Sequence, residues 1–429
     1  MIYSRRFYSF SSVVPGDGGV SILFIRFNTE KNSASGFFRP WFSDILPTRL
    51  LALATIVILL LLSLPATRVC ASAGWWVPSS VEIERAVADV SAYRERTIRG
   101  FYLPSNLVAD EARMSGYLDL IADTELNAVV IDIKDDRGWI TYETELELPR
   151  EYRAVDARMG DLRELAGKLE AHGIHAIGRL VVFKDDRLAM ARPDLTIRHG
   201  GSGPWRDSTG AHWVDPYSRE VWDYNSAVGR EVIEMGFPEV QLDYVRFPTD
   251  GNVRAAEYPH LDGTIHRSRL IADFIKDFHW QVFSAGGLSS IDIFGLVPTV
   301  RDDMQLGQQW EEVIEVTDFV SPMVYPSHYG PNIYGLPVPN HAPYETVWHT
   351  MRDGLQRWEA GDSLLRPWLQ DFSWGYRYGP SEVRGQIRAT EEHGIDSWLL
   401  WNAAGVYTRD ALHPSIEGED DEIQSGTGG

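Results

Sequence analysis

A repeated order of elements constrains the fold of this chain most strongly: a short apolar run, a loop, then an amphipathic stretch. The order begins at residue 96 and continues to about residue 405. The apolar runs predict eight strands, at 97–103, 128–133, 175–182, 239–245, 290–296, 319–324, 365–369 and 397–401. The amphipathic stretches predict helices at 111–123, 161–172, 219–235, 266–282, 308–316, 344–358 and 381–393. Alternating strands and helices form a parallel sheet, and eight such units favour a closed (β/α)8 TIM barrel over the alternative, an open doubly wound sheet.

The segment before the repeat contains a targeting signal. Residues 50–66 form an uncharged apolar run that follows Arg49 and precedes Ala71-Ser72-Ala73, a small-x-small cleavage pattern. This arrangement is typical of a secretory signal peptide, and the run is also just long enough for a membrane anchor. We therefore expect an exported barrel, with 50–73 as a cleaved signal or an anchor and 1–49 as an unstructured extension. Only an uncleaved 50–66 segment would bring the chain into contact with a membrane.

The remainder of the chain is predicted to hold one large domain. Residues 74–95 form a lead-in with a short helix near 81–93, residues 96–405 form the barrel, and 406–429 form an acidic tail rich in Gly and Ser. The formal net charge is −21, from 61 acidic and 40 basic residues. Nucleic acid is therefore a poor partner, because it attracts basic proteins. The single cysteine, Cys70, excludes an intrachain disulfide.

Three aspartates lie at or near the carboxyl ends of predicted strands, where α/β barrels hold their active sites. Asp243 ends the fourth strand, Asp292 interrupts the apolar fifth strand, and Asp371 follows the seventh. Cleavage of a glycosidic bond uses a carboxylate at the anomeric carbon and a carboxylic acid of raised pKa that protonates the leaving oxygen. We therefore predict Asp243, Asp292 and Asp371 as catalytic residues. The alternative for each is a structural role, which for Asp243 would be an ion pair with Arg246.

Polar and aromatic residues on the same rim are predicted to bind the substrate. Alternation places Gln241, Asp243 and Val245 on one face of the fourth strand. It also places Asp132 and Lys134 on one face of the second strand, where they could form an ion pair. Trp and Tyr rings on the rim could stack on the apolar faces of sugars. The predicted substrate-binding residues are Tyr102, Asp132, Lys134, Arg179, Gln241, Arg246, Tyr325, Gln370, Trp401 and Asn402.

Other chemistries find less support in the sequence. It contains no HxH, HExxH or Cys cluster for zinc, no P-loop, no strand-linked GxGxxG and no GxSxG motif. We therefore predict neither a metal nor a cofactor. Two alternatives stay open beside a hydrolase with a carboxylate pair. One is a non-catalytic carbohydrate-binding barrel at the cell surface, and the other is a metal-assisted hydrolase with Asp132, Asp135 and Asp243 around a divalent ion.

Several blocks of residues resemble a known family. They are, in chain order, NAVVIDIKDDRG at 127–138, VFKD at 182–185, WVDPY at 213–217, VWDY at 221–224 and QLDYVRFP at 241–248. These blocks resemble those of a bacterial family of glycoside hydrolases that was formerly grouped as a domain of unknown function. The resemblance covers about residues 97–405.

The resemblance implies a TIM barrel distantly related to the α-amylase group. In that group the nucleophile ends strand four, the acid lies on strand five and a stabilising aspartate lies on strand seven, and Asp243, Asp292 and Asp371 match those strands. Two positions depart from the pattern: Gln241 stands where an arginine precedes the nucleophile by two residues, and Asp292 stands where the acid is a glutamate. The expected function is that of a retaining hydrolase or transglycosidase acting on an extracytoplasmic polysaccharide.

Overall fold

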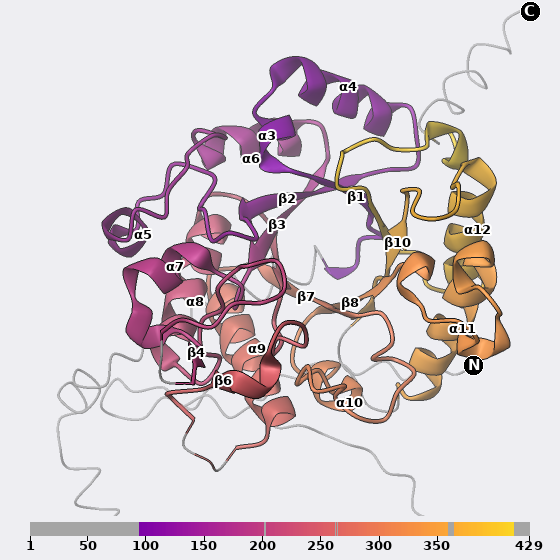
Figure 1. Ribbon diagram of the computed structural model, residues 1–429. Helices are drawn as coiled ribbons and strands as arrows, with labels where there is room; N and C mark the ends of the chain where they lie inside the picture. The colour runs from indigo at the N-terminus through magenta and orange to yellow at the C-terminus, as the bar shows by residue number, and fades with distance from the viewer. Residues whose placement is uncertain (1–93, 201–202, 262, 264, 359–363, 416–429) are drawn as a thin grey trace, which may run out of the picture. The chain divides into compact units, whose positions relative to one another are not determined.

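Eight strand positions close into one parallel barrel in the computed structural model, which describes residues 94–200, 203–261, 263, 265–358 and 364–415 (Figure 1). The strands are β1 (Arg99–Leu103), β2 (Ala128–Lys134), β3 (His175–Val181), β5 (Glu239–Asp243), β7 (Leu288–Phe294), β8 (Phe319–Val324), β9 (Leu364–Leu365), β10 (Trp368–Gln370) and β11 (Trp398–Trp401). Strands β9 and β10 both pair with β8 and share one position. Because β11 pairs with β10 and with β1, the ring is closed. The predicted (β/α)8 barrel is therefore confirmed, and an open sheet is wrong.

Helices surround the strands on the outside (Figure 1). They are α3 (Ser105–Val108), α4 (Glu111–Ala122), α5 (Glu147–Glu151), α6 (Leu162–Ala171), α7 (Asp186–Ala191), α8 (Arg219–Glu234), α9 (Arg267–Ser284), α10 (Trp310–Val313), α11 (Pro343–Gln356) and α12 (Pro380–Glu391). Each of the seven predicted helices overlaps one of these, although α10 is much shorter than the predicted 308–316 stretch. A small antiparallel pair, β4 (Arg198–His199) with β6 (Ala256–Glu257), lies in the long loops.

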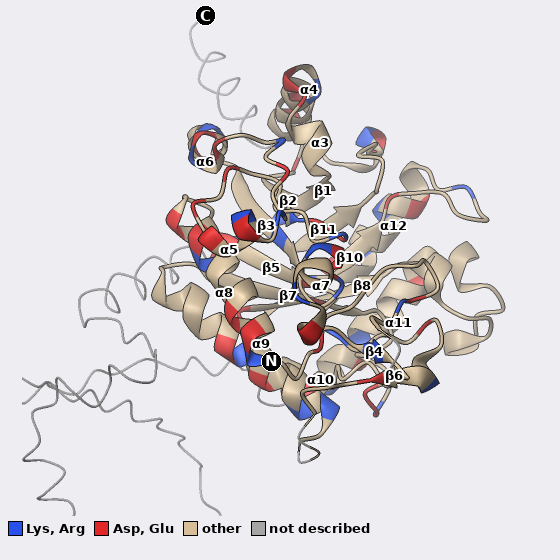
Figure 2. Ribbon diagram, turned by 60° about the vertical axis from the view of Figure 1, so that its left-hand side comes forward, with Lys and Arg blue, Asp and Glu red and all other residues tan. Residues whose placement is uncertain are grey.

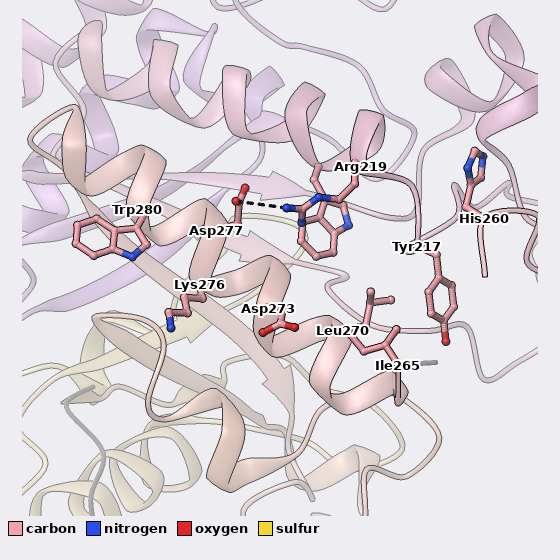
Figure 3. Close-up of a pocket in the computed structure, with 10 residues that line it drawn as sticks. Tyr217, Arg219, His260, Ile265, Leu270, Asp273, Lys276, Asp277 and Trp280 are labelled. Carbon is pink, nitrogen blue, oxygen red and sulfur yellow. Dashed lines mark ion pairs between the residues drawn. The ribbon is translucent and has the colours of Figure 1, made fainter. Parts of the chain in front are cut away.

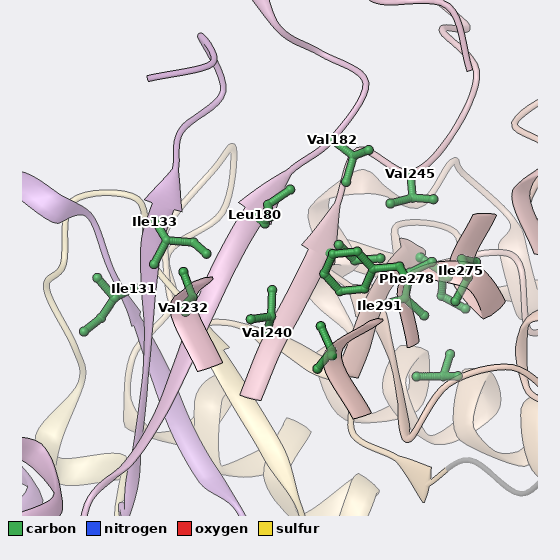
Figure 4. Packing of buried hydrophobic residues seen from close by; sticks show 14 of the residues in the cluster. Ile131, Ile133, Leu180, Val182, Val232, Val240, Val245, Ile275, Phe278 and Ile291 are labelled. Atoms are coloured by element: carbon green, nitrogen blue, oxygen red, sulfur yellow. The ribbon is translucent and has the colours of Figure 1, made fainter. Parts of the chain in front are cut away.

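Apolar side chains fill the layer between the strands and the helices. Leu180 and Val240 point outward from β3 and β5 toward Val232 of α8 and Phe278 of α9 (Figure 4). Gly229 of α8 permits this packing, because a Cβ there would lie 2.5 Å from the Phe278 ring. A second apolar cluster fills the interior of the ring and includes Ile98, Tyr102, Ala128, Val130, Ile177, Tyr325, Trp368 and Leu399.

A buried ion pair crosses the interior near the amino ends of the strands. Glu239, the first residue of β5, pairs with Arg366, and both side chains are fully buried. Glu239 also accepts a hydrogen bond from Ser290 at 2.5 Å, and its Oε2 lies 3.0 Å from His175 Nε2. Burial alone would raise the pKa of Glu239, but the charge of Arg366 and the hydrogen bonds from His175 and Arg366 lower it to about 2. The sequence analysis did not predict this pair.

Several predicted segments lie outside the described residues. They are the extension 1–49, the signal or anchor segment 50–73, the predicted helix near 81–93 and the tail from residue 416. Within the part of the chain that the structure describes, no helix combines the length and apolar character needed to cross a membrane.

Candidate active site

An arginine joins two aspartates at the carboxyl ends of the barrel strands. Arg179 of β3 donates a hydrogen bond to Asp132 Oδ1 at 2.5 Å. On its other side it donates two hydrogen bonds to Asp243 Oδ2, from Nε at 3.0 Å and from Nη2 at 2.5 Å. Tyr102 of β1 completes the cluster by donating to Asp132 Oδ2 at 2.6 Å. All four side chains are buried. They come from β1, β2, β3 and β5 and form one charged cluster inside the barrel mouth.

Strand register explains how the arginine reaches Asp243. Parallel pairing of β3 with β5 sets Arg179 opposite Gln241, two residues before Asp243. Arg179 therefore reaches the carboxylate of Asp243 from the neighbouring strand. Gln241 instead donates its amide to Ser321 Oγ of β8 at 3.1 Å.

The backbone after Asp243 fixes the other carboxylate oxygen. The backbone N–H of Tyr244 donates to Asp243 Oδ1 at 2.6 Å, and Tyr244 has a left-handed φ of 53°. This φ ends the strand alternation, because a left-handed residue reverses the side on which the next side chains lie. Val245 consequently packs in the outer apolar layer (Figure 4), and the prediction that it shares a face with Asp243 is wrong.

A second carboxyl group lies on the adjacent strand. Parallel pairing sets Leu242 opposite Ile291, so Asp243 and Asp292 occupy the next positions on neighbouring strands β5 and β7. Asp292 Oδ1 accepts a hydrogen bond from the indole Nε1 of Trp368 at 2.7 Å. Burial, and then the negative charge of Asp243, raise the pKa of Asp292 well above its ordinary value. The site thus combines an arginine-paired carboxylate with a carboxyl group that favours its protonated form.

Aromatic rings form one wall of the site. Trp401 of β11 stacks on Tyr102 with ring centroids 4.1 Å apart and an interplanar angle of 20°. The guanidinium carbon of Arg179 lies 5.3 Å from the Trp401 ring centroid. The Tyr325 ring lies 6.4 Å from Trp401, and from there a row of rings continues outward through His328 and Phe372 to the exposed Trp374. This wall offers flat apolar surface beside the two carboxyl groups.

Lys134 lies away from this cluster. The pairing of β2 with β3 shifts register between Asp132 and Lys134, so the two side chains no longer share a face. Lys134 Nζ instead lies 2.7 Å from Asp185 Oδ2 and donates to Asn225 of α8 at 2.8 Å. The predicted ion pair between Asp132 and Lys134 is therefore wrong, and Lys134 stabilises the packing of α8 on the barrel.

The three-aspartate metal site is not formed. Asp135 Oδ1 accepts hydrogen bonds from the backbone N–H groups of Arg137 and Trp139, both at 3.0 Å. Asp132 and Asp243 both form an ion pair with Arg179, so a positively charged guanidinium lies between the two carboxylates. Among the described residues, no group of three or more His, Cys, Asp and Glu side chains could hold a metal ion.

The predicted residues at the ends of β10 and β11 contact neighbouring loops of the chain. Both carboxylate oxygens of Asp371 accept hydrogen bonds from Thr408, from its hydroxyl at 2.6 Å and its backbone N–H at 2.9 Å. Asn402 donates to the carbonyl of Asp371 at 2.6 Å, and Gln370 accepts from the backbone N–H of Ser327 at 3.1 Å. The catalytic role of Asp371 and the contacts of Gln370 and Asn402 with a substrate stay predictions.

Trp368 is the functional candidate that the sequence analysis missed. It lies two residues before Gln370, which was predicted to face the site, and alternation along a strand would have placed Trp368 on that same face. Its indole is the hydrogen-bond donor to Asp292. The signal was therefore present, but a tryptophan at the start of an apolar strand also fits ordinary core packing.

A surface pocket of about 520 Å³ lies elsewhere, along α8, α9 and the loop between them (Figure 3). It is lined by Tyr217, Arg219, Trp222, His260, Ile265, Leu270, Asp273, Lys276, Asp277 and Trp280. Arg219 and Asp277 form an ion pair across it with N and O atoms 4.0 Å apart. None of the predicted site residues lines this pocket, so it is separate from the aspartate cluster.

Comparison with known proteins agrees with the barrel. Residues 100–407 match the model of a family described as "putative glycosyl hydrolase domain". Among solved structures, the PgaB (BpsB) glycoside hydrolase domain from Bordetella bronchiseptica is 13% identical, with a TM-score of 0.54 over 74% of this chain and 99% of that chain. A hypothetical protein from Ruminiclostridium thermocellum is 33% identical over 45% of this chain and 96% of that chain, with a TM-score of 0.41. No curated protein matches. The likeness to the Bordetella domain shows the same fold.

Proposed function

The chain belongs to the family of putative glycosyl hydrolase domains, and on that premise we propose that it is an exported hydrolase or transglycosidase that cleaves a polysaccharide with retention of configuration. A glycosyl hydrolase acts on carbohydrate. The observation that carries the finer proposal is the pair of carboxyl groups on β5 and β7, with Asp243 bound to Arg179 and Asp292 buried beside it.

The environments of the two carboxyl groups suit two different tasks. Asp243, paired with Arg179, is the nucleophile that forms a bond to the anomeric carbon. Asp292, whose pKa is raised, donates its proton to the leaving oxygen as the glycosidic bond breaks. In the second step Asp292, now ionised, takes a proton from a water molecule. The water oxygen bonds to the anomeric carbon and the bond to Asp243 breaks, which restores both groups.

Strand geometry brings the two carboxyl groups to the same part of the barrel mouth. The backbones of neighbouring strands lie about 4.8 Å apart, and Asp243 and Asp292 follow the paired residues Leu242 and Ile291 on two such strands. Retaining enzymes hold their carboxyl groups about 5–5.5 Å apart, whereas inverting enzymes leave about 6.5–9.5 Å for a water molecule. The proposed retention requires the shorter separation, which suits side chains on adjacent strands. The stack of Tyr102 and Trp401 beside the pair supports binding of a sugar ring, because an aromatic face covers C–H groups.

Export is supported by the sequence before the barrel. Arg49, the apolar run 50–66 and Ala71-Ser72-Ala73 together have the form of a signal peptide or anchor. N-terminal sequencing of protein recovered outside the cytoplasm should give a start near Gly74, or the full chain should fractionate with membranes. A barrel found in the cytosolic fraction would contradict export.

The decisive experiment measures released reducing ends. The chain is incubated with a panel of cell-wall polysaccharides and exopolysaccharides, and proton NMR follows the anomeric configuration of the first product formed. Release of reducing ends with retained configuration is the expected result. Inverted product would remove the nucleophilic role from Asp243. Binding without any cleavage would instead favour the alternative, a non-catalytic carbohydrate-binding barrel.

Replacing Trp368 should change the pH dependence of cleavage. In Trp368→Phe, Asp292 loses the indole donor that stabilises its ionised form, so its pKa should rise further. Activity that needs a protonated Asp292 is lost as the pH rises through that pKa. The alkaline limb of kcat/KM should therefore move to higher pH in the variant. An unchanged alkaline limb, on a substrate that the wild type cleaves, would show that Asp292 does not set it.

A further inference from the structure

Two more cations lie beside Asp243 on the rim of the barrel. Lys184 follows β3 and Arg246 follows β5, and both approach the ring of Tyr244, the residue after Asp243. The Lys184 Nζ lies 5.0 Å from the Tyr244 ring centroid, and the Arg246 guanidinium carbon lies 5.2 Å from it. Both loops leave the carboxyl ends of their strands, so the two cations lie on the same side of the barrel as the proposed catalytic pair.

The positive charge of Arg246 is not neutralised by the protein. Its guanidinium carbon lies 5.0 Å from the ring centroid of Trp213, and Nη1 donates to the carbonyl of Phe247 at 3.2 Å. Within the described residues, no carboxylate forms an ion pair with it. The predicted structural pair with Asp243 is therefore absent, because Asp243 pairs with Arg179.

Lys184 is only weakly neutralised. Its Nζ lies 3.9 Å from Asp136 Oδ2, whose side chain is 57% exposed, whereas the Lys184 side chain is 11% exposed. An ion pair at this distance with a solvated carboxylate contributes little. Lys184 also lies within electrostatic reach of Asp207, whereas Arg246 is partly exposed and has no carboxylate partner among the described residues. The positive charge left at Arg246 beside Lys184 therefore suits an anionic group that the protein does not itself provide.

The rest of the molecule makes this placement unusual. The chain carries a net charge of −21, and acidic side chains lie on outer helices such as α5 and α9 (Figure 2). Such a surface repels polyanions in general. A polyanion that binds nonetheless must contact a local cationic site.

We propose that Lys184 and Arg246 form an anion subsite next to Asp243, and that the polysaccharide substrate carries an anionic oxygen group there. The carboxylate of a uronic acid and a sulfate ester share this chemistry. The planar guanidinium of Arg246 can donate two parallel hydrogen bonds to such a group, and the ammonium of Lys184 adds a point charge. This inference names the substrate class of the proposed hydrolase and so rests on that function.

Affinity electrophoresis of the full chain tests the subsite without requiring cleavage. The gels contain polygalacturonate or alginate, the same polymers after reduction of their carboxyl groups, or dextran sulfate beside dextran. The retardation of the wild type gives an apparent Kd for each polymer. This Kd should be at least about tenfold lower for an acidic polymer than for its neutral counterpart. Retardation by the uronate polymers identifies a carboxylate, and retardation by dextran sulfate alone identifies a sulfate.

Three variants separate a charge contact from a change in the fold. Arg246→Gln should abolish the preference for the acidic polymer, and Arg246→Lys should retain part of it. Arg267→Gln is the matched control, because Arg267 of α9 also lies over aromatic rings, 4.7 Å from Phe247, but does not approach Tyr244; it should behave as the wild type.

Equal retardation by acidic and neutral polymers would overturn the proposal, and so would the absence of retardation by every acidic polymer. A preference for the acidic polymer that survives in Arg246→Gln would also overturn it. Selective retardation without release of reducing ends would leave the subsite standing and contradict the hydrolase. Cleavage of neutral polymers alone would support the hydrolase and contradict the anion subsite.

Discussion

Asp243→Asn is expected to lower kcat by at least about 10³-fold, which corresponds to roughly 4 kcal/mol of transition-state stabilisation. An amide cannot replace a carboxylate as the nucleophile. Its single oxygen can still accept the hydrogen bonds from Arg179, whereas its NH2 group then faces the backbone N–H of Tyr244 and that one hydrogen bond is lost. Arg179 also keeps its bond to Asp132. The fold and the affinity for sugar should therefore change little, and the loss should appear in kcat, measured as reducing ends released at saturating substrate.

Two further variants make this result specific. Asp250→Asn changes an aspartate on the loop after β5 that binds Ser208, so it should retain wild-type activity. Asp292→Asn should reduce kcat less for substrates with good leaving groups, because such groups need no proton. Full activity of Asp243→Asn, on a polysaccharide that the wild type cleaves, would remove Asp243 from the mechanism.

The sequence predicts the barrel because its periodic pattern is strong. Each strand is a short apolar run bounded by loops. Strands inside a barrel are buried, and an apolar run is the direct sequence signature of a buried strand. The same regularity predicts that Asp243 and Asp292 lie at the mouth, because carboxyl ends of parallel strands meet on one side. Arg179 was predicted to bind substrate, and it lies between Asp132 and Asp243 because of strand register. Register between strands far apart in the chain cannot be read from one sequence.

Local irregularities account for the predictions that are wrong. The register shift after Asp132 turns Lys134 toward α8, and the left-handed φ of Tyr244 turns Val245 into the outer layer. Both interrupt the period of two on which the side-chain assignments depend. Neither is marked by a glycine or proline at that point in the sequence. Both irregularities directly follow an aspartate of the candidate site, Asp132 in one case and Asp243 in the other.

The pairing of Glu239 with Arg366 escaped prediction for a related reason. The two residues are separated by 127 positions and each alone resembles an ordinary charged residue at a strand boundary. Only closure of the ring brings them together across the interior. Their burial makes each dependent on the other, because a buried charge without its partner is costly.

Arg366→Met should lower the free energy of unfolding by about 3–5 kcal/mol, the usual cost of leaving one buried charge unpaired. Glu239 would keep only its contacts with His175 and Ser290. Urea unfolding followed by tryptophan fluorescence measures the change. The pair lies at the amino ends of the strands, so the folded variant should still cleave the substrate. The pKa of Asp292 should rise in it, because the charge of Arg366 no longer lowers that pKa.

The double variant Glu239→Gln with Arg366→Met should recover much of the lost stability, because it removes the unpaired carboxylate. The pH dependence provides a second readout. The folded pKa of Glu239 is about 2, below the value of about 4.3 for an unfolded glutamate, so the wild type binds fewer protons here when folded. The contribution of the pair is therefore fully present above pH ~4.3 and is lost as the pH falls toward 2. The double variant should lack this acid-dependent loss. If Arg366→Met unfolds at the same urea concentration as the wild type, with the same slope, the pair contributes nothing measurable and Glu239 must be solvated in the folded chain.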